Sequence, residues 1–327
     1  MTLRTVTVVG LGLIGGSLLR ALAAEPGRTV HGYDADPATR DAARAEPGPW
    51  RIHDTAEAAV RDADLVVLAV PPHATPGVLA GLADHPGLVT DVASVKSPVL
   101  AAARRQPVRF VGGHPMAGTE RAGFAASDPD LFTGRAWVLC LEPDTRLADW
   151  LAVARLVLGL GARVVPTTAA EHDAAVARIS HLPHLVASAL AATAADPLSR
   201  TLAAGSYADG TRVAASPPAL WADICAGNAP AVRAALDALL DALAAARSTV
   251  DVRPALAAWF EPGHAARTSW PPVAGPARPV PATPEALLAL GAAGGWLTAV
   301  TDTGLAGLVP ETAAGPDQDP ITAPETG

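Results

Sequence analysis

Four polar clusters and one glycine-rich turn contain the residue types that could do chemistry in this chain. The clusters are residues 91–97, 112–120, 171–184 and 205–212, and the turn is residues 10–17. The clusters supply hydroxyl groups, imidazoles and guanidinium groups, which suit proton transfer and the binding of a carboxylate. The turn suits the binding of a phosphate.

The turn has the spacing GxGxxG, directly after an apolar run and at the start of a helix-like stretch. Gly10 permits a tight turn, Gly12 lets the backbone approach a pyrophosphate, and Gly15 lets the helix pack against the strand. The backbone N–H groups of Leu13 and Ile14 then face the phosphates at the helix N-terminus. This pattern predicts a dinucleotide site, with a structural turn as the alternative.

Asp34 ends the next apolar run, 19 residues after Gly15. A carboxylate at this position accepts hydrogen bonds from ribose hydroxyls and repels a 2′-phosphate, so NAD is favoured over NADP. Arg40 could reach a 2′-phosphate, which leaves NADP as the minor alternative. Val70 and Pro71 end a later strand at the same sheet edge and are expected to shape a loop beside the cofactor.

Ser94 and Lys96 follow the next predicted strand, near the expected position of the nicotinamide. The alternative is structural, with Ser97 capping a helix and Lys96 on the surface. His114 can act as a hydrogen-bond acceptor or base near neutral pH. A single histidine after a strand is often structural, but the glycines and the proline around this one favour a function.

His181 and His184 are three residues apart and are expected on one helix face. No convincing partner ligands accompany them, so we expect no metal and assign them to substrate or hydrogen-bonding roles. Arg212 follows a polar segment predicted to be a loop. Its guanidinium suits a substrate carboxylate, and the alternative is a surface ion pair with Asp209.

The elements that must position these side chains divide the chain into three parts. Residues 1–166 alternate β-branched runs with alanine-rich stretches, which predicts a Rossmann-type α/β fold with a doubly wound, mostly parallel sheet. Residues 167–262 contain long alanine- and leucine-rich stretches, which predict an all-helical substrate and dimerisation domain.

Residues 263–327 are rich in proline, alanine and glycine and are predicted to be a partly disordered tail. Within it we expect a linker over 271–284, a short helix over 284–290 and a short strand over 296–300. Disorder is expected after Val309.

The composition excludes several classes of function. The net charge of −8 without a basic stripe argues against a nucleic-acid partner. No apolar run is long enough to cross a membrane, and a strand-like run near the N-terminus leaves no room for a signal peptide. We therefore expect a cytoplasmic protein. Cys140 and Cys225 lack the spacing of a disulfide framework or zinc site.

Taken in order, these segments resemble the prephenate/arogenate dehydrogenase family of tyrosine biosynthesis. The strings His-Pro-Met-Ala-Gly-Thr-Glu and Ser-His-Leu-Pro-His are its most specific parts. The resemblance covers residues 1 to about 260 and rests on residues 10–17, 63–72, 91–96, 112–120, 180–184, 205–212 and 221–224.

The resemblance implies an NAD-dependent oxidative decarboxylation. A hydride leaves the hydroxyl-bearing ring carbon of prephenate, and loss of CO2 makes the ring aromatic, which gives 4-hydroxyphenylpyruvate. His114 would accept the hydrogen bond of the ring hydroxyl, and Ser94 would orient both. Arg212 would hold a substrate carboxylate, and His184 would contact the pyruvyl side chain. Ala208 replaces a basic residue that is usual in the family, so the contacts of its segment stay open.

The remaining polar residues take peripheral roles in the same resemblance. His181 and Lys96 belong to the polar surround of the site, and Thr119 and Glu120 lie near its mouth. Asp209 pairs with the neighbouring arginine or acts as a gate. A homodimer through the helical domain is the family expectation.

Three alternatives remain open from the sequence. The substrate could be arogenate, which differs from prephenate only in its side-chain amino group. The chain could be another Rossmann hydroxyacid or imino-acid dehydrogenase, although the hydroxyacid enzymes use a lysine in the helical domain and the single lysine here is Lys96. It could also be an NAD(H)-sensing module without chemistry.

Overall fold

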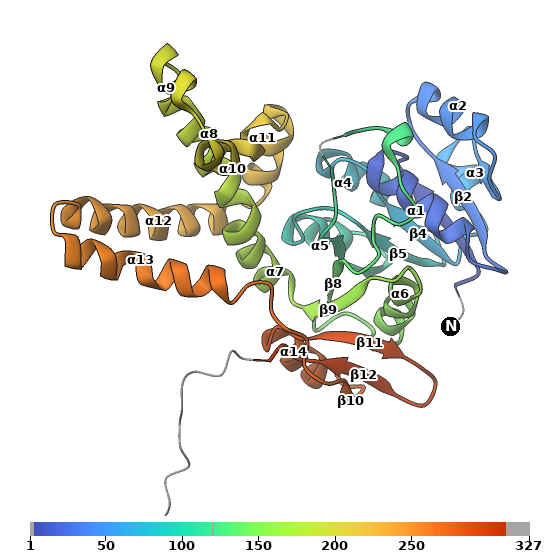
Figure 1. Ribbon diagram of the computed structural model, residues 1–327. Helices are drawn as coiled ribbons and strands as arrows, with labels where there is room; N and C mark the ends of the chain where they lie inside the picture. Colours follow the sequence, from blue (N-terminus) through green and yellow to red (C-terminus); the bar gives the residue numbers. More distant parts are fainter. Residues whose placement is uncertain (1–2, 120, 312–327) are drawn as a thin grey trace, which may run out of the picture.

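The computed structural model describes residues 3–119 and 121–311 and contains two sheets and a helical domain (Figure 1). The first sheet has six parallel strands in the order β3-β2-β1-β4-β5-β6. Its strands are β1 Thr5–Val9, β2 Thr29–Tyr33, β3 Trp50–Ile52, β4 Leu65–Leu68, β5 Leu88–Asp91 and β6 Arg109–Val111. This order confirms the predicted Rossmann-type fold.

Helices cover both faces of this sheet, as a parallel sheet requires. On one face Leu18 and Leu22 pack with Val8 in the main buried core, and on the other Leu79 packs with Val66. The apolar runs of the strands are therefore buried on both sides. The helices of this domain are α1 Leu13–Ala23, α2 Pro37–Ala45, α3 Ala56–Val60, α4 Thr75–Ala80, α5 Ser97–Ala103 and α6 Leu147–Gly159.

The later strands form a separate sheet, which corrects the prediction of a single, mostly parallel sheet over residues 1–166. Its order is β10-β12-β11-β9-β8-β7, and only β8 and β9 run parallel among its pairs. The chain passes from the first sheet to the second at Gly112, the single residue between β6 and β7. Strands β7, β8 and β9 span Gly113–Pro115, Ala136–Cys140 and Arg163–Thr167.

Residues 273–311 fold onto this second sheet as a C-terminal module, so the prediction of a tail is wrong for them. The predicted short helix and strand are present, but β10 lies inside the expected linker. Leu287 and Leu297 belong to the same buried core as α6, which explains why this proline-rich stretch is ordered. The module contains β10 Arg278–Val280, α14 Pro284–Ala292, β11 Trp296–Val300 and β12 Leu305–Leu308.

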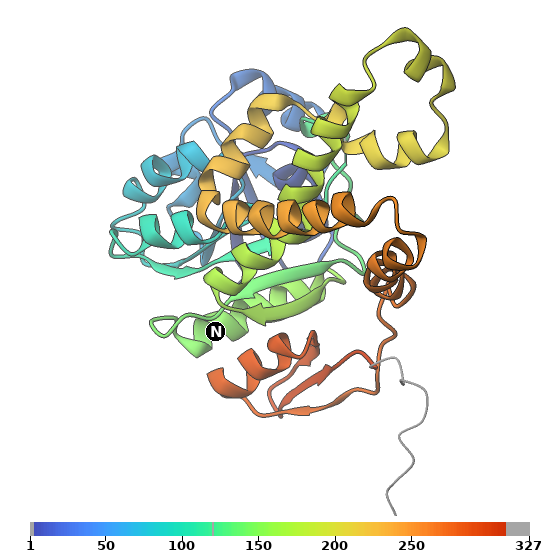
Figure 2. The same ribbon diagram turned by 90° about the vertical axis from the view of Figure 1, so that its left-hand side faces the viewer.

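The prediction of disorder after Val309 falls mostly outside the described part of the chain. Pro310 is described and forms a β-bridge with Ala274, while residues 312–327 lie beyond the described range. Figure 2 shows the module below α6 and β9, at the end of the molecule away from α2 and α3.

The second domain is helical, as predicted, and extends past residue 262. Helix α13 contains Pro262 and continues to Thr268. The predicted polar loop over 205–212 is helix α10 followed by a 3₁₀ turn that starts at Arg212. The helices are α7 Ala169–Val176, α8 Leu182–Thr193, α9 Pro197–Leu202, α10 Gly205–Thr211, α11 Pro218–Gly227, α12 Ala229–Thr249 and α13 Arg253–Thr268. Within the described ranges, no helix is both long and apolar enough to span a bilayer.

Candidate active site

The glycine-rich turn has the close contacts that its spacing predicts. Gly10 has a φ of +95°, and a Cβ there would lie 2.4 Å from the carbonyl oxygen of Ala69. A Cβ on Gly15 would lie 1.8 Å from the carbonyl oxygen of Gly10. A Cβ on Gly12 would meet no atom within 4 Å, so the backbone at Gly12 faces open space. The close packing thus excludes side chains at Gly10 and Gly15, and a ligand has room beside Gly12.

The N-terminus of α1 is free to bind an anion. Gly12 is its N-cap, no side chain caps it, and its first turn contains no acidic residue. The first two helical residues, Leu13 and Ile14, therefore lack the acceptor that a side chain would supply. The backbone of Val70, which precedes Pro71, lies beside Gly10 and brings the end of β4 to this turn. The arrangement fits a pyrophosphate.

Asp34 lies at the end of β2, beside the turn. Its carboxylate accepts hydrogen bonds from the backbone N–H groups of Leu11 (2.7 Å) and Asp36 (2.9 Å). The guanidinium of Arg40 donates to the carbonyl oxygens of Asp34 (2.7 Å) and Ala35 (3.1 Å). The half-exposed carboxylate is thereby fixed at the edge where a ribose would lie.

At the end of β5, Asp91 organises the crossover between the two sheets. Its carboxylate accepts the N–H of Gly113 (3.0 Å) and forms an ion pair with the ammonium of Lys96. Lys96 also donates to the carbonyl oxygen of Gly113 (2.6 Å) and is fully buried. Lys96 is paired with Asp91 in the core, so its alternative surface position is wrong, and its place in the polar surround of the site stays a prediction. Lys96 fixes the residue before His114.

A chain of hydrogen bonds runs from His114 into the helical domain. Nδ1 of His114 lies 2.8 Å from Nε2 of His172, and Nδ1 of His172 lies 2.8 Å from Oδ1 of Asp173. The carboxylate of Asp173 also accepts the backbone N–H groups of Lys96 and Ser97, each at 2.8 Å. Asp173 thus binds the first turn of α5, in place of the predicted cap by Ser97.

This chain of hydrogen bonds assigns the tautomers of both histidines. An ionised Asp173 can only accept, so Nδ1 of His172 donates, and in a neutral His172 the other nitrogen, Nε2, accepts. Nδ1 of His114 must then donate to His172, which leaves the lone pair of His114 on Nε2. His114 is therefore set up as a neutral hydrogen-bond acceptor.

The pKa values agree with this assignment. Burial alone would raise the pKa of Asp173, but hydrogen bonds from His172, Lys96 and Ser97 lower it to about 2. Burial, helped by the neighbouring His172 and Lys96, lowers the pKa of His114 well below its ordinary value of 6.5. Asp173 is ionised and His114 is neutral near pH 7.

Ser94 does not contact His114 in this structure. Across the described ranges, the Ser94 hydroxyl makes no hydrogen bond, and the ring nitrogen that it was expected to orient is bound by His172. Sequence analysis missed His172 and Asp173 because adjacent helical residues usually point in different directions. Here His172 donates to its own neighbour, which spacing rules do not anticipate.

Asn228 connects this chain of hydrogen bonds to His181. Its side-chain amide donates to the carbonyl oxygen of Asp173 (2.7 Å) and lies 3.3 Å from Nδ1 of His181. His181 ends a π-helical segment, Ala177–His181, between α7 and α8. Such segments often occur at functional sites because they redirect side chains. Asn228 and His181 are both buried, and they extend the chain of hydrogen bonds further into the helical domain.

His184 stacks on Trp221 of α11. The ring centroids are 3.3 Å apart and the planes differ by 20°. Nδ1 of His184 lies 2.9 Å from the carbonyl oxygen of Ser180, so Nδ1 donates and Nε2 is the acceptor. His181 contacts the edge of the same indole. The two histidines thus share one aromatic partner.

The other predicted substrate residues lie on exposed surface. Arg212, Asp209 and Thr119 are exposed, on the 3₁₀ turn, on α10 and after β7 respectively. Glu120 lies outside the described residues. Among the described residues, no group of three histidine, cysteine or acidic side chains is arranged to hold a metal.

A parallel sheet with an open phosphate-binding turn and a neutral histidine acceptor defines the class of dinucleotide-dependent dehydrogenases. Residues 18–166 match the family model described as prephenate dehydrogenase, nucleotide-binding domain, and residues 168–260 match its dimerization domain. The chain belongs to the prephenate dehydrogenase family.

Two relatives show the range of activities in this family. The cyclohexadienyl dehydrogenase of Zymomonas mobilis is 37% identical, over 75% of this chain and 88% of the relative. The prephenate dehydrogenase of Bacillus subtilis is 35% identical, over 68% of this chain and 64% of the relative. The C-terminal module lies beyond the residues that the two family models match.

Two solved structures are also similar. Prephenate dehydrogenase from Aquifex aeolicus, in complex with hydroxyphenyl propionate and NAD+, has a TM-score of 0.75 at 26% identity, covering 82% of this chain and 99% of that one. Arogenate dehydrogenase from Synechocystis has a TM-score of 0.72 at 30% identity, covering 81% and 99%.

Proposed function

We propose that this chain oxidises prephenate with NAD+ and releases CO2, 4-hydroxyphenylpyruvate and NADH. The observation that carries this proposal is the hydrogen-bond chain from Asp173 through His172 to His114. It leaves Nε2 of His114 as an acceptor on β7, directly after the crossover from the sheet that bears the dinucleotide turn. Oxidation of a ring alcohol needs such an acceptor beside the nicotinamide.

His114 takes the proton of the ring hydroxyl as the carbonyl forms. Its Nδ1–H remains hydrogen-bonded to His172, and the negative charge of Asp173 stabilises the imidazolium that develops. The breaking bond to CO2 supplies the electrons that make the ring aromatic, so the protein needs to supply mainly orientation and this acceptor. Ser94 would orient the same hydroxyl, a role that follows the family resemblance.

The substrate is oriented by residues of the helical domain. Arg212 binds a substrate carboxylate, which its planar guanidinium suits. His184, whose ring is fixed against Trp221, contacts the pyruvyl side chain through Nε2. Thr119, Glu120 and Asp209 line the entrance. These roles follow the family resemblance of the motifs around them.

NAD+ fits the observed turn. The N–H groups of Leu13 and Ile14 hold its pyrophosphate, Gly12 leaves room for it, and Asp34 binds the adenosine ribose. When bound, NAD+ is the two-electron oxidant of the reaction.

Asp34 sets the preference for NAD+ over NADP+. We expect Asp34→Ser to raise KM for NAD+ about tenfold, because a charged hydrogen bond to the ribose is lost. Removing the carboxylate also removes its repulsion of a 2′-phosphate. The ratio of kcat/KM with NAD+ to kcat/KM with NADP+ should therefore fall further. Steady-state KM values for both cofactors measure this. Asp36→Ser is the matched control, since Asp36 caps α2 at the next turn. An unchanged ratio of kcat/KM values in Asp34→Ser would contradict the role.

The enzyme works as a homodimer through its helical domain. Large apolar side chains are exposed on the helices of this domain, which suits burial against a second copy. They include Ile179, Leu198, Leu202, Leu240 and Phe260. The match to a dimerization domain supports this assembly. We place the enzyme in the cytoplasm, where its expected cofactor and substrate are found.

The test is NAD+ reduction with prephenate, arogenate and 3-hydroxyisobutyrate, each repeated with NADP+. We expect turnover of prephenate with NAD+. Turnover of arogenate alone would show that the chain is an arogenate dehydrogenase, the activity named for the Synechocystis protein. Turnover of only 3-hydroxyisobutyrate, or NADH binding without turnover of either cyclohexadienyl acid, would overturn the proposal.

A further inference from the structure

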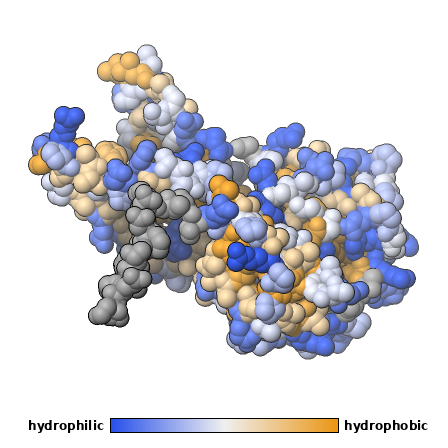
Figure 3. All heavy atoms as spheres, turned by 60° about the horizontal axis from the view of Figure 1, so that its bottom comes forward, coloured by the Kyte–Doolittle hydropathy of each residue, from blue (hydrophilic) through white to orange (hydrophobic). Residues whose placement is uncertain are grey.

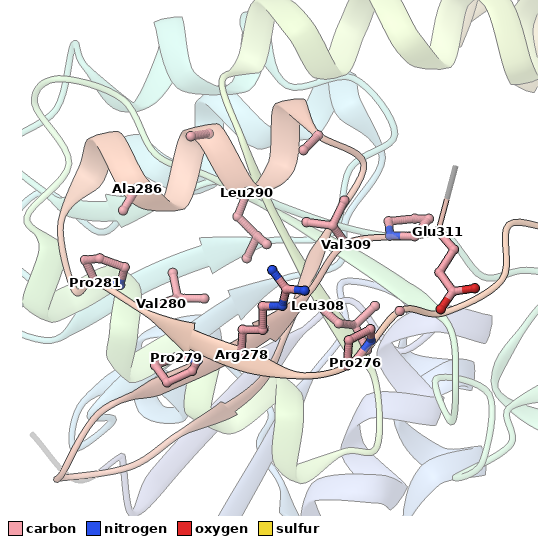
Figure 4. Close-up of a pocket in the computed structure, with 15 residues that line it drawn as sticks. Pro276, Arg278, Pro279, Val280, Pro281, Ala286, Leu290, Leu308, Val309 and Glu311 are labelled. Carbon is pink, nitrogen blue, oxygen red and sulfur yellow. The ribbon is translucent and has the colours of Figure 1, made fainter. Parts of the chain in front are cut away.

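The C-terminal module contains a large cavity within the described part of the chain. Its volume is about 540 Å³, against about 250 and 240 Å³ for two others. Cavities of this size accept small organic molecules. The walls come from one face of α14, from β10 and from the end of β12 (Figure 4). Figure 3 turns this end of the molecule forward and shows apolar side chains gathered there.

The cavity is lined by apolar and conformationally restricted residues. Leu290, Val280 and Leu308 form its apolar walls, and Pro276 and Pro279 stiffen its rim. Proline fixes the backbone φ, so such a rim loses little conformational entropy when a ligand binds. The β10 side of the cavity is therefore stiff before a ligand binds, and α14 forms the opposite wall.

Arg278, an exposed residue of the edge strand β10, lines this cavity with a cation. In Figure 4 its guanidinium points into the cavity, between Leu290 and Leu308. Throughout the described ranges, Arg278 makes no ion pair and no side-chain hydrogen bond. A guanidinium with free donors recognises a carboxylate through two parallel hydrogen bonds. The apolar walls favour an organic body over a free phosphate.

A second charged residue, Glu311, lines the other end of the cavity. Its negative charge disfavours a ligand with two acidic groups and accommodates an ammonium group. We propose that this cavity binds a small apolar monocarboxylate, a class that includes apolar amino acids and their deaminated acids.

The wall of this cavity also touches the strand that leads to His172. A Cβ on Gly291 of α14 would lie 1.7 Å from the carbonyl oxygen of Pro166, so helix and strand meet backbone to backbone. Pro166 lies two residues before Thr168, which caps α7, and α7 contains His172 and Asp173. A ligand that moves α14 must act on Pro166. Occupancy of the cavity is thereby coupled to the orientation of His114, a consequence that rests on the proposed function.

The binding test is isothermal titration calorimetry of the full chain with four probes. L-phenylalanine and 3-phenylpropionate share one carbon skeleton, and L-leucine and 4-methylpentanoate share another, with and without the ammonium group. We expect at least one pair to bind, and Arg278→Ala to weaken it about tenfold or more. Arg105→Ala, which removes an exposed arginine at the end of α5, is the matched control and should bind normally.

Three outcomes would overturn the inference. No binding of any probe removes the site, and binding that survives Arg278→Ala places the probe elsewhere. Binding without any effect of the probe on kcat removes the coupling through Pro166. A His114→Asn variant, which loses turnover under the proposed function, should still bind the probe. This comparison separates a failure of the cavity from a failure of the catalytic proposal.

Discussion

His114→Asn is expected to lower kcat with prephenate by about 10²-fold or more. Asparagine is similar in size and keeps a hydrogen-bonding group, but it cannot accept a proton near neutral pH. The hydroxyl proton must then pass to water, and the charge that develops in the transition state loses its acceptor. NAD+ affinity should change little, because the dinucleotide site is formed by Gly12, Leu13 and Asp34. Steady-state kinetics and an NADH fluorescence titration measure the two quantities.

The control for this experiment is another partly buried histidine that has no place in the site. His85 precedes β5, at the opposite end of the strand from Asp91, and burial lowers its pKa as well. His85→Asn should leave kcat within about twofold of the parent. If His114→Asn retained near-normal kcat, His114 would not be the proton acceptor. If both variants lost activity equally, the loss would reflect general destabilisation.

The first sheet could be predicted because its signals are local. Runs such as residues 65–68 are buried on both faces, and glycines mark the turn that follows β1. The second sheet could not be predicted as a separate unit. Its strands come from residues 113–167 and 278–308, and only long-range pairing joins Leu297 to Val164. Sequence periodicity contains no information about such pairing.

The C-terminal module was obscured by its composition. Proline and glycine usually mark linkers, but β10 is a short edge strand, where Pro279 is tolerated. A few large residues, among them Leu287, Leu290 and Leu297, bury enough apolar surface to hold the module on α6. A few residues placed at one interface thus outweigh the average composition of the segment.

The site was predictable where one motif supplies all the atoms, as in the turn at Gly10. It was not predictable where two domains meet. His114 is oriented by His172, 58 residues further along the chain, and the backbone N–H groups of Lys96 and Ser97 donate to Asp173 of the helical domain. Ser94 was expected to orient His114 because the family resemblance implied it. The contact that decides the tautomer depends on how α7 docks on α5.

Asp173→Asn should lower kcat by about 10²-fold or more. It should also move the acidic limb of the pH profile of kcat/KM, where activity falls as His114 is protonated, to lower pH. The loss of kcat follows because an amide can no longer fix the tautomer of His172 or stabilise the imidazolium of His114. The pH shift has a definite sign. The negative charge of Asp173 raises the pKa of His114, against the stronger effect of burial, so its removal lowers that pKa further. In the parent enzyme the limb already lies below pH 6.5, and in the variant it lies lower still.

The same carboxylate also binds the first turn of α5, so a loss of activity alone would not separate orientation from folding. His172→Gln interrupts the hydrogen-bond chain and leaves the bonds from Lys96 N and Ser97 N to Asp173 in place. It should lose kcat by a similar factor with little change in Tm. Glu142→Gln is the matched control, because Glu142 accepts the N–H of Ala169 at the start of α7 without reaching a histidine. Its kcat and pH profile should match the parent. An unshifted acidic limb in Asp173→Asn, together with normal kcat in His172→Gln, would show that His114 works without this orientation and that Asp173 serves the helix alone.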